Sequence, residues 1–200
     1  SRIEMTFAPG KYIKHEVKLT WFDGHLLPPT EAVPGLADYA VVNGKDIENR
    51  KAAKAKKEGK PYTAPATIAP VVPDNGVIII GSKATTIGQS HASRPVCIAG
   101  DKATFDAAMP AGDKASSYNH YREFVEACQA NDPARCGSKL AYAAPLTEAL
   151  LIGCIALRYP GEELCFDPKA MKFTNKPEAN EFLKAPKRND WDFTKMMAGR

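Results

Sequence analysis

The chain lacks any apolar run long enough to cross a membrane. A spanning helix needs about 20 consecutive apolar residues, and the longest candidate, residues 149–157, is shorter and contains Gly153. A strong charge of either sign is also missing, because 27 basic residues face 23 acidic ones and leave a net charge of +4. Such an excess supplies only weak non-specific attraction to nucleic acid or to an anionic lipid surface. We therefore expect no nucleic-acid partner and no membrane.

Cysteine and histidine are scarce and scattered. The five cysteines are odd in number and none form a Cys-x-x-Cys pair; they are Cys97, Cys128, Cys136, Cys154 and Cys165. This pattern argues against a zinc ribbon and a complete disulfide framework and favours free, mostly buried thiols, with a Cys128–Cys136 disulfide left open. The four histidines have no paired spacing on a helix face; they are His15, His25, His91 and His120. We expect no metal site made from this chain alone.

The motifs of a self-contained enzyme are missing too. No Gly-x-Ser-x-Gly elbow is present, and no Gly-x-Gly-x-x-Gly loop follows a strand. Residues 81–86 (GSKATT) resemble a phosphate-binding loop in composition alone, since the upstream glycine of that motif is absent, and we interpret them as a strand-to-turn connection. Residues 1–7 alternate like a strand and show no signal-peptide pattern. We assign no catalytic and no cofactor-binding residue to this chain, and we expect it to be part of a longer protein.

The composition, 44% hydrophobic and 25% charged, is that of one globular domain or at most two small ones, and we interpret residues 1–200 as a single, partial domain. Alternating apolar residues predict a hairpin from residues 3–7 and 17–21. The β-branched run 77–81 predicts a central strand covered on both faces, and a weaker strand follows at 95–99. Further predicted elements are a helix capped by Ser116-Ser117 and running to Cys128, a helix from Pro145 to Leu157, strands at 163–166 and 171–174, a capping-box helix from Asn175 to Leu183, and a docked tail with Trp191 and Phe193. The Pro145 helix is apolar all round and should be the most buried one.

Residues 45–75 differ from the rest of the chain. A lysine-rich stretch from Asp46 to Gly59 has almost no large apolar residue, which predicts a solvated helix or a mobile excursion. Four prolines then follow, at positions 61, 65, 70 and 73, and they favour an extended surface loop. We interpret 45–75 as a basic and proline-rich insertion within the domain.

One cluster of chemistry-bearing residues lies at the end of the second predicted strand. Trp21, Asp23 and His25 bring an aromatic face, a carboxylate and an imidazole within a few residues. An indole stacks on the C–H surface of a sugar-like polyol and a carboxylate accepts its hydroxyl hydrogen bonds. These three are the candidate substrate-binding residues. The structural alternative is that Trp21 is a core or interface residue in phase with Val17 and Leu19, and that Asp23-Gly24 is simply a turn. Glu148, within the apolar helix, is a further candidate for facing a polar cavity or for pairing inside the core.

Several strings resemble one known family in their order and approximate spacing. They are residues 17–24 (VKLTWFDG) followed by 26–29, residues 76–83 (GVIIIGSK), residues 144–153 (APLTEALLIG) continuing through 156–158, and then 166–168, 171–175, 177–180 and Trp191. Together they resemble the C-terminal domain of the Gfo/Idh/MocA oxidoreductases, the relatives of glucose-fructose oxidoreductase and inositol dehydrogenase. The resemblance covers most of the chain except the basic and proline-rich stretch. This chain has His25 where the family usually has a glycine after Asp-Gly.

The resemblance implies an α+β fold with a large open, mostly antiparallel β-sheet and a few helices on one face. It also implies a parent enzyme whose N-terminal Rossmann domain holds NAD or NADP, while this domain lines the substrate site and forms a homodimer or higher homo-oligomer through the sheet. The family's nucleotide loop and its catalytic lysine, aspartate and histidine belong upstream and have no counterpart in residues 1–200.

The expected function is therefore substrate binding and oligomerisation in an NAD(P)-dependent oxidoreductase of a sugar or polyol, without catalysis by this chain alone. The alternative is a non-catalytic carbohydrate-binding or scaffold module with the same half-fold. Relatives in the resembling bacterial branch are often exported, so bacterial periplasm and cytoplasm both stay open.

Overall fold

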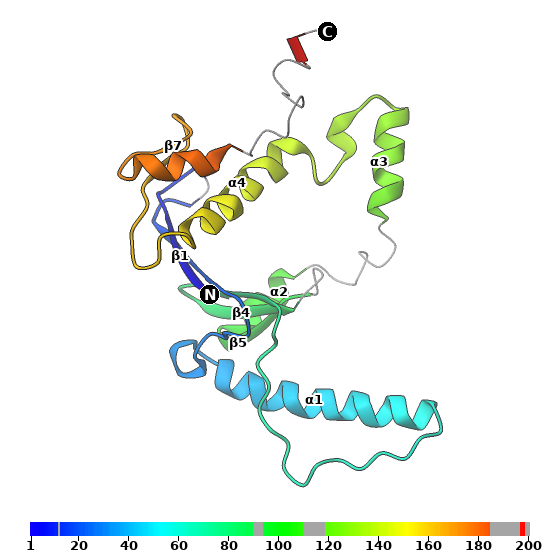
Figure 1. Ribbon diagram of the computed structural model, residues 1–200. Helices are drawn as coiled ribbons and strands as arrows, with labels where there is room; N and C mark the ends of the chain where they lie inside the picture. The colour runs from blue at the N-terminus through cyan, green and yellow to red at the C-terminus, as the bar shows by residue number, and fades with distance from the viewer. Residues whose placement is uncertain (12, 90–93, 110–118, 185–196, 199–200) are drawn as a thin grey trace. The chain divides into compact units, whose positions relative to one another are not determined.

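The computed structural model describes residues 1–11, 13–89, 94–109, 119–184 and 197–198, and it divides the chain into two compact units (Figure 1). Unit 1 comprises Ser1–Arg2 and Trp21–Tyr118, and unit 2 comprises Ile3–Thr20 and Asn119–Arg200. Helices and short antiparallel strands occur together, so the chain is an α+β protein, as the sequence predicted. Within the described ranges the strands form sheets of two, three and two strands, and the expected large open sheet is not among them.

Unit 1 is built on an antiparallel sheet in the order β3-β4-β5, with β3 at Gly76–Ile80, β4 at Ala84–Gln89 and β5 at Val96–Gly100. Ile78 of β3 is the register partner of Ile87 on β4. The central strand, β4, follows residues 81–83 and was missed by the sequence analysis, which took 81–86 for a connection. Its threonines favour a strand, but no apolar alternation marks it out.

The prediction that the run 77–81 is a central strand covered on both faces is wrong. β3 is an edge strand of its sheet. Val77 and Ile79 point to the face opposite Ile78, and they are 54% and 60% exposed. A β-branched run raises strand propensity, but it does not state how many neighbouring strands or layers the fold provides.

Helix α1 (Leu36–Lys57) packs on the other face of this sheet (Figure 1). Its first turn begins after Gly35, whose φ of 79° and tight approach to the Ile98 carbonyl favour glycine. The core of unit 1 joins the helix and the 3-10 turn before it (Thr30–Ala32) to the sheet: Val33, Leu36 and Ile87 are buried, with Tyr39, Val72, Ile78 and Ile98 packed against them. The helix therefore begins ten residues earlier than the basic stretch from which it was predicted, and its first half is core.

The proline-rich segment after α1, residues 61–75, runs back along the helix, and we call it the return segment. The Val71 N–H donates to the Ala40 carbonyl at 2.9 Å, and the Asn43 side-chain amide donates to the Val71 carbonyl at 2.8 Å. A Cβ on Gly44 would clash with the Ala69 carbonyl oxygen, so glycine permits this close approach. Further along, the Tyr62 hydroxyl donates to Glu48. This part of the predicted insertion is hydrogen-bonded to the helix that forms the core of unit 1.

Unit 2 joins a hairpin to helix α4. Strands β1 (Arg2–Phe7) and β2 (Val17–Phe22) pair where the alternation predicted. Helix α4 (Leu140–Ala156) approaches β1 at Gly153, whose missing side chain leaves room for Met5 and Ile3. The helix contains Pro145 in its interior, whereas the sequence analysis placed that proline near its start.

The apolar composition of helix α4 predicted that it would be the most buried helix, and this prediction is wrong. Only Gly153 and Ile155 are buried along its length, and Leu151 is 59% exposed. Apolar residues all round a helix indicate that burial would be favourable. They do not supply the neighbouring elements that would bury them.

The remaining helices are capped by side chains. Asp101 accepts from the Thr104 N–H at the start of α2 (Lys102–Ala108), and the hydroxyl and N–H of Thr104 lower the pKa of Asp101. Asn119 accepts from Tyr121 N–H and Arg122 N–H at the start of α3 (His120–Gln129), which a short 3-10 turn (Pro133–Arg135) follows. The predicted cap Ser116-Ser117 and the tail residues Trp191 and Phe193 lie outside the described residues.

The C-terminal part of unit 2 folds around Phe173. Strands β6 (Phe166–Asp167) and β7 (Lys172–Phe173) pair antiparallel and lead into a 3-10 helix at Pro177–Leu183. Phe173, Ile155 and Ala179 are buried together. The N–H groups of Ala170 and Lys169 donate to Asp167 and lower its pKa, which stabilises the β6–β7 turn.

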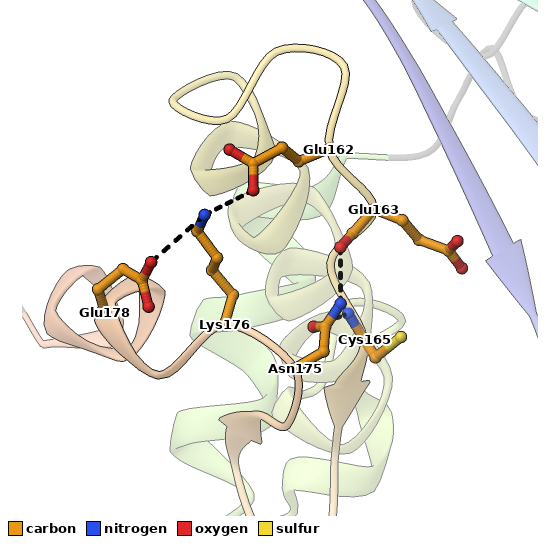
Figure 2. A network of polar contacts seen from close by, with 6 residues as sticks. All are labelled: Glu162, Glu163, Cys165, Asn175, Lys176 and Glu178. Atoms are coloured by element: carbon orange, nitrogen blue, oxygen red, sulfur yellow. Dashed lines mark hydrogen bonds and ion pairs between the residues drawn. The ribbon is translucent and has the colours of Figure 1, made fainter.

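Figure 2 shows the polar network that connects these segments. The Asn175 side chain accepts from Cys165 N–H at 2.8 Å and donates to the Glu163 carbonyl at 2.7 Å. Lys176 contacts Glu162 at 2.5 Å and Glu178 at 3.3 Å, and these carboxylates, Glu162 first, raise the pKa of the lysine. Asn175 was predicted to cap the last helix. Its side chain instead joins its own segment to Glu163 and Cys165, ten or more residues earlier in the chain.

We predict that Asn175→Ala loosens the 163–165 segment, because it removes the acceptor of the Cys165 N–H and the donor to the Glu163 carbonyl, and these exposed backbone groups then bond to water. The expected cost to unit 2 is about 1–3 kcal/mol. Amide hydrogen exchange of Cys165 should accelerate, since that N–H donates to Asn175. Asn175→Asp, which keeps the acceptor, should protect this amide better than alanine does. Unchanged exchange in Asn175→Ala would contradict the role given to this side chain.

Candidate functional site

The predicted substrate residues lie at the end of β2, in unit 1. Trp21 is 45% exposed, so it is not a core residue, and this exposure fits both a ligand-binding role and the interface role of the structural alternative. Asp23 is fixed by its backbone, because its N–H donates to the Ser1 carbonyl at 2.9 Å and its carbonyl accepts from the Ser1 amino group at 2.7 Å. Its carboxylate accepts from the Gly24 N–H at 2.7 Å. The turn therefore holds a carboxylate in a defined place beside an exposed indole.

His25 adopts a backbone conformation that side chains rarely take. Gly24 and His25 both have a φ of 67°, in the left-handed region. Glycine is favoured there because a Cβ approaches the backbone carbonyl. His25 stands at the position where the family that the chain resembles usually has glycine. The imidazole is exposed, and no hydrogen bond joins it to Trp21 or Asp23 in the described part of the chain.

A polar hollow lies elsewhere in unit 1, along helix α1. It has a volume of about 510 Å³ and opens to solvent. Six of its lining residues come from successive turns of α1 and one comes from the end of β4; they are Tyr39, Asn43, Asp46, Asn49, Arg50, Ala53 and Gln89. Phenol, amide, carboxylate and guanidinium groups thus gather on one stripe of the helix, which is the donor and acceptor set suited to a hydroxyl-rich ligand.

The inner end of the hollow is held by a chain of side-chain hydrogen bonds. Gln89 Nε2 donates to Tyr39 Oη at 3.0 Å and approaches Asn43 Oδ1 at 3.4 Å. Asn43 is 5% exposed, and its amide donates to the Val71 carbonyl. Because a buried amide is costly unless it is hydrogen-bonded, these contacts fix Asn43 and Gln89, which both line the hollow.

The outer end of the hollow is formed by exposed side chains. Arg50 Nε donates to the Asp46 carbonyl of its own helix at 3.3 Å. A second, smaller hollow of about 320 Å³ adjoins this one, shares Asn43, Arg50 and Gln89 with it, and is completed by Ile47, Val71, Val72, Pro73 and Asp74. Arg50 therefore stands between two concave surfaces.

Close to this stripe, Glu48 faces the return segment. Lys51, at 2.7 Å, and then the Tyr62 hydroxyl lower the pKa of Glu48, and the pKa of Tyr62 is raised by the same carboxylate. Both shifts favour the charged carboxylate with a protonated phenol. The hydrogen bond from the Tyr62 hydroxyl to Glu48 attaches the start of the return segment to α1.

The hollow was not predicted from the sequence, because the helix was expected to begin at Asp46 and to be solvated. The residues at 39, 43, 46, 50 and 53 recur at intervals of three or four, which places them on one face of a helix. That signal was readable only with a helix beginning near Leu36. Gln89 could not have been found, since β4 itself was missed.

The other candidates form no site. Glu148 is half-buried on α4, with no hydrogen bond or ion pair of its carboxylate within the described ranges. The cysteines are free, but the prediction that they are mostly buried is wrong, because Cys128, Cys154 and Cys165 are exposed and Cys97 and Cys136 are partly exposed. His91 lies outside the described residues. A search of the described residues finds no metal-ligand cluster and no helix that is long and apolar enough to span a bilayer.

We predict that His25→Gly stabilises the protein, because glycine takes the left-handed conformation without the contact that a Cβ makes. The expected gain is about 0.5–1 kcal/mol after the larger conformational entropy of glycine in the unfolded chain is subtracted. Thermal unfolding followed by circular dichroism measures it. His15→Gly is the matched control, since His15 is an exposed histidine without a positive φ, and it should give no gain. A loss of stability in His25→Gly would show that the imidazole makes a contact worth more than the strain.

A scan against protein-family models and searches of curated proteins and of solved structures gave no match. The function is therefore argued from the residues themselves and from the family resemblance of the sequence.

Proposed function

We propose that this chain is the substrate-binding and oligomerisation domain of an NAD(P)-dependent oxidoreductase that acts on a sugar or polyol. In this proposal NAD or NADP is held by a separate Rossmann domain, and the chain is not catalytic alone. Hydride transfer is the chemistry that the nicotinamide supplies. The role of this chain is to line the substrate site and to bring two copies together.

The observation that carries the proposal is the exposure of apolar side chains, in the described part of the chain, on the face of the β3-β4-β5 sheet opposite α1. Helix α1 packs on one face, where Ile78 joins the core. On the opposite face Val77 and Ile79 are exposed side by side on an edge strand. An exposed apolar sheet face with a free edge is typical of a surface that another chain or domain covers.

A second copy of this chain is the occupant that we propose for that face. A two-fold axis places the same surface against itself, so that each Ile79 contacts the partner's apolar face. The resemblance implies a large open sheet. In this proposal that sheet forms in the parent protein, when further strands extend the short sheets of each chain. The strings that carry the resemblance include β3 with its following turn, the end of β2, and most of α4.

The end of β2 is the proposed part of the substrate wall. Trp21 offers an exposed ring for stacking on a sugar face, and the Asp23 carboxylate accepts hydroxyl hydrogen bonds. Exposure of the indole supports this role, because a Trp21 buried in the core could not contact a ligand. His25 stands at the same turn as a potential donor to a hydroxyl.

We expect the chain to be a homodimer in solution and Ile79→Asn to weaken it. An amide on the apolar face loses the burial and adds a polar group that must be desolvated, so dimer affinity should fall about tenfold or more. Size-exclusion chromatography with light scattering measures the mass. Val42→Asn is the matched control, because Val42 is 55% exposed but lies on α1, and it should leave the dimer intact. A wild-type monomer, or equal loss in the two variants, would contradict the role of the sheet face.

The placement of the cofactor is tested by calorimetry with NADH and NADPH. We expect neither nucleotide to bind the chain alone, and saturable binding would contradict a cofactor site elsewhere.

The reading frame upstream of Ser1 separates the two function classes. A strand followed by a Gly-x-Gly-x-x-Gly loop within about 150–200 residues supports the oxidoreductase, whereas a stop codon or signal peptide immediately upstream favours the non-catalytic carbohydrate-binding module.

A further inference from the structure

The hollow along α1 is separate from the Trp21 turn and from the sheet face, and it has chemistry of its own. Its volume of about 510 Å³ falls in the range of about 300–1,000 Å³ that small-molecule sites occupy. Three lining side chains, those of Asp46, Asn49 and Arg50, are exposed and come from consecutive turns of one helix. They can meet a ligand without any change in the backbone.

Arg50 is placed to receive an anion. Its Nε is occupied by the Asp46 carbonyl, which holds the base of the guanidinium against the helix. No carboxylate pairs with this guanidinium in the portion of the chain that the structure describes. The two terminal nitrogens therefore remain as a fork, and such a fork binds a carboxylate through two parallel hydrogen bonds.

The charge around the hollow favours an anionic ligand. Residues 45–60 contain seven basic and three acidic side chains, an excess equal to the net charge of +4 of the whole chain. Lys54, Lys56 and Lys57 lie in the last turn of α1, beyond the outer end of the hollow. Their summed field attracts a negative group toward Arg50.

The other lining groups suit hydroxyls. Asp46 accepts hydrogen bonds, and the Asn49 amide both accepts and donates. Tyr39 Oη already accepts from Gln89, which leaves its own O–H to donate. Asp46 stands one turn from Arg50, so a compact dianion such as phosphate would be repelled by that carboxylate. A single carboxylate on a hydroxyl-rich body satisfies both groups.

We propose that this hollow binds a sugar acid, a polyhydroxylated carboxylate of hexuronate size. Arg50 binds the ligand carboxylate, and Asp46, Asn49 and Tyr39 bind its hydroxyl groups. Asn43 acts as a positioning residue, because its buried amide lines the hollow and is fixed by hydrogen bonds to the Val71 carbonyl and from Gln89, which lines the hollow beside it. The inference concerns the hollow alone and does not depend on a parent oxidoreductase or on dimerisation.

The test is a titration of the full chain with glucuronate and, separately, with glucose, followed by calorimetry and by NMR shifts of the chain. Glucuronate should bind saturably and glucose about tenfold or more weakly, because glucose lacks the carboxylate. Arg50→Gln should weaken glucuronate binding by about tenfold or more, and Arg50→Lys, which keeps the charge but loses the fork, should fall between. Lys57→Gln is the matched control; it removes one positive charge from the same helix outside the hollow and should change affinity by less than about twofold.

Three results would overturn the inference. The first is the absence of saturable glucuronate binding to the wild-type chain. The second is glucose binding as tightly as glucuronate, which would remove the role of the guanidinium. The third is an equal loss in Lys57→Gln and Arg50→Gln, which would show a diffuse charge effect and no site. Circular dichroism of each variant identifies a change of fold, and Arg50 is exposed, so none is expected.

Discussion

Unit 1 depends on the packing of helix α1 against one face of a small antiparallel sheet. Leu36 and Ile87 are buried where the first turn of the helix meets the central strand, and Val33 completes the cluster. One helix of this kind can cover one face of three strands. On the opposite face Val77 and Ile79 are exposed among the described residues of this unit, and this is the surface that we propose for dimerisation.

The two ends of α1 serve different purposes because their residues differ. The first half has Leu36, Ala40 and Gly44 on the core side, where small and apolar residues allow the sheet and the return segment to approach. The second half is basic and solvated. Between them lies the polar stripe of Asn43, Asp46 and Arg50, where the buried face passes into the charged face. A helix that changes character along its length thus creates a concave polar surface at the transition.

Unit 2 is stabilised differently, since its core is small and polar contacts connect segments that are distant in sequence. Phe173 is buried among short elements, while Asn175 and Lys176 join the 162–165 segment to the last helix. The pKa of Glu178 is lowered, first by its own backbone N–H and then by Lys176. Its contribution to stability is therefore present above the ordinary pKa of a glutamate and is lost as the pH falls through the lowered value. The raised pKa of Lys176 works in the opposite range: its contribution is present at neutral pH and is lost in strong alkali, as the pH rises through the raised value.

Local patterns were sufficient for the elements whose side chains alternate or recur clearly. The hairpin of β1 and β2, strand β5 and the apolar helix α4 all lie where these patterns predicted them. Patterns failed where composition was ambiguous: β4 contains Thr85, Thr86 and Gly88 and has no apolar alternation, and α1 was recognised only by its lysines. The Trp21, Asp23 and His25 cluster was readable because it is contiguous, whereas the hollow joins α1 to Gln89 across the fold and was not.

By itself the sequence determined the α+β class, the hairpin of β1 and β2, strand β5 and most of helix α4. These are local properties, set by backbone propensity and by the period of apolar residues. Only the tertiary structure decided that β3 is an edge strand, that α4 is mostly exposed, and that the proline-rich segment lies along α1. Burial and edge position depend on which neighbours the chain supplies, and no local pattern carries that information.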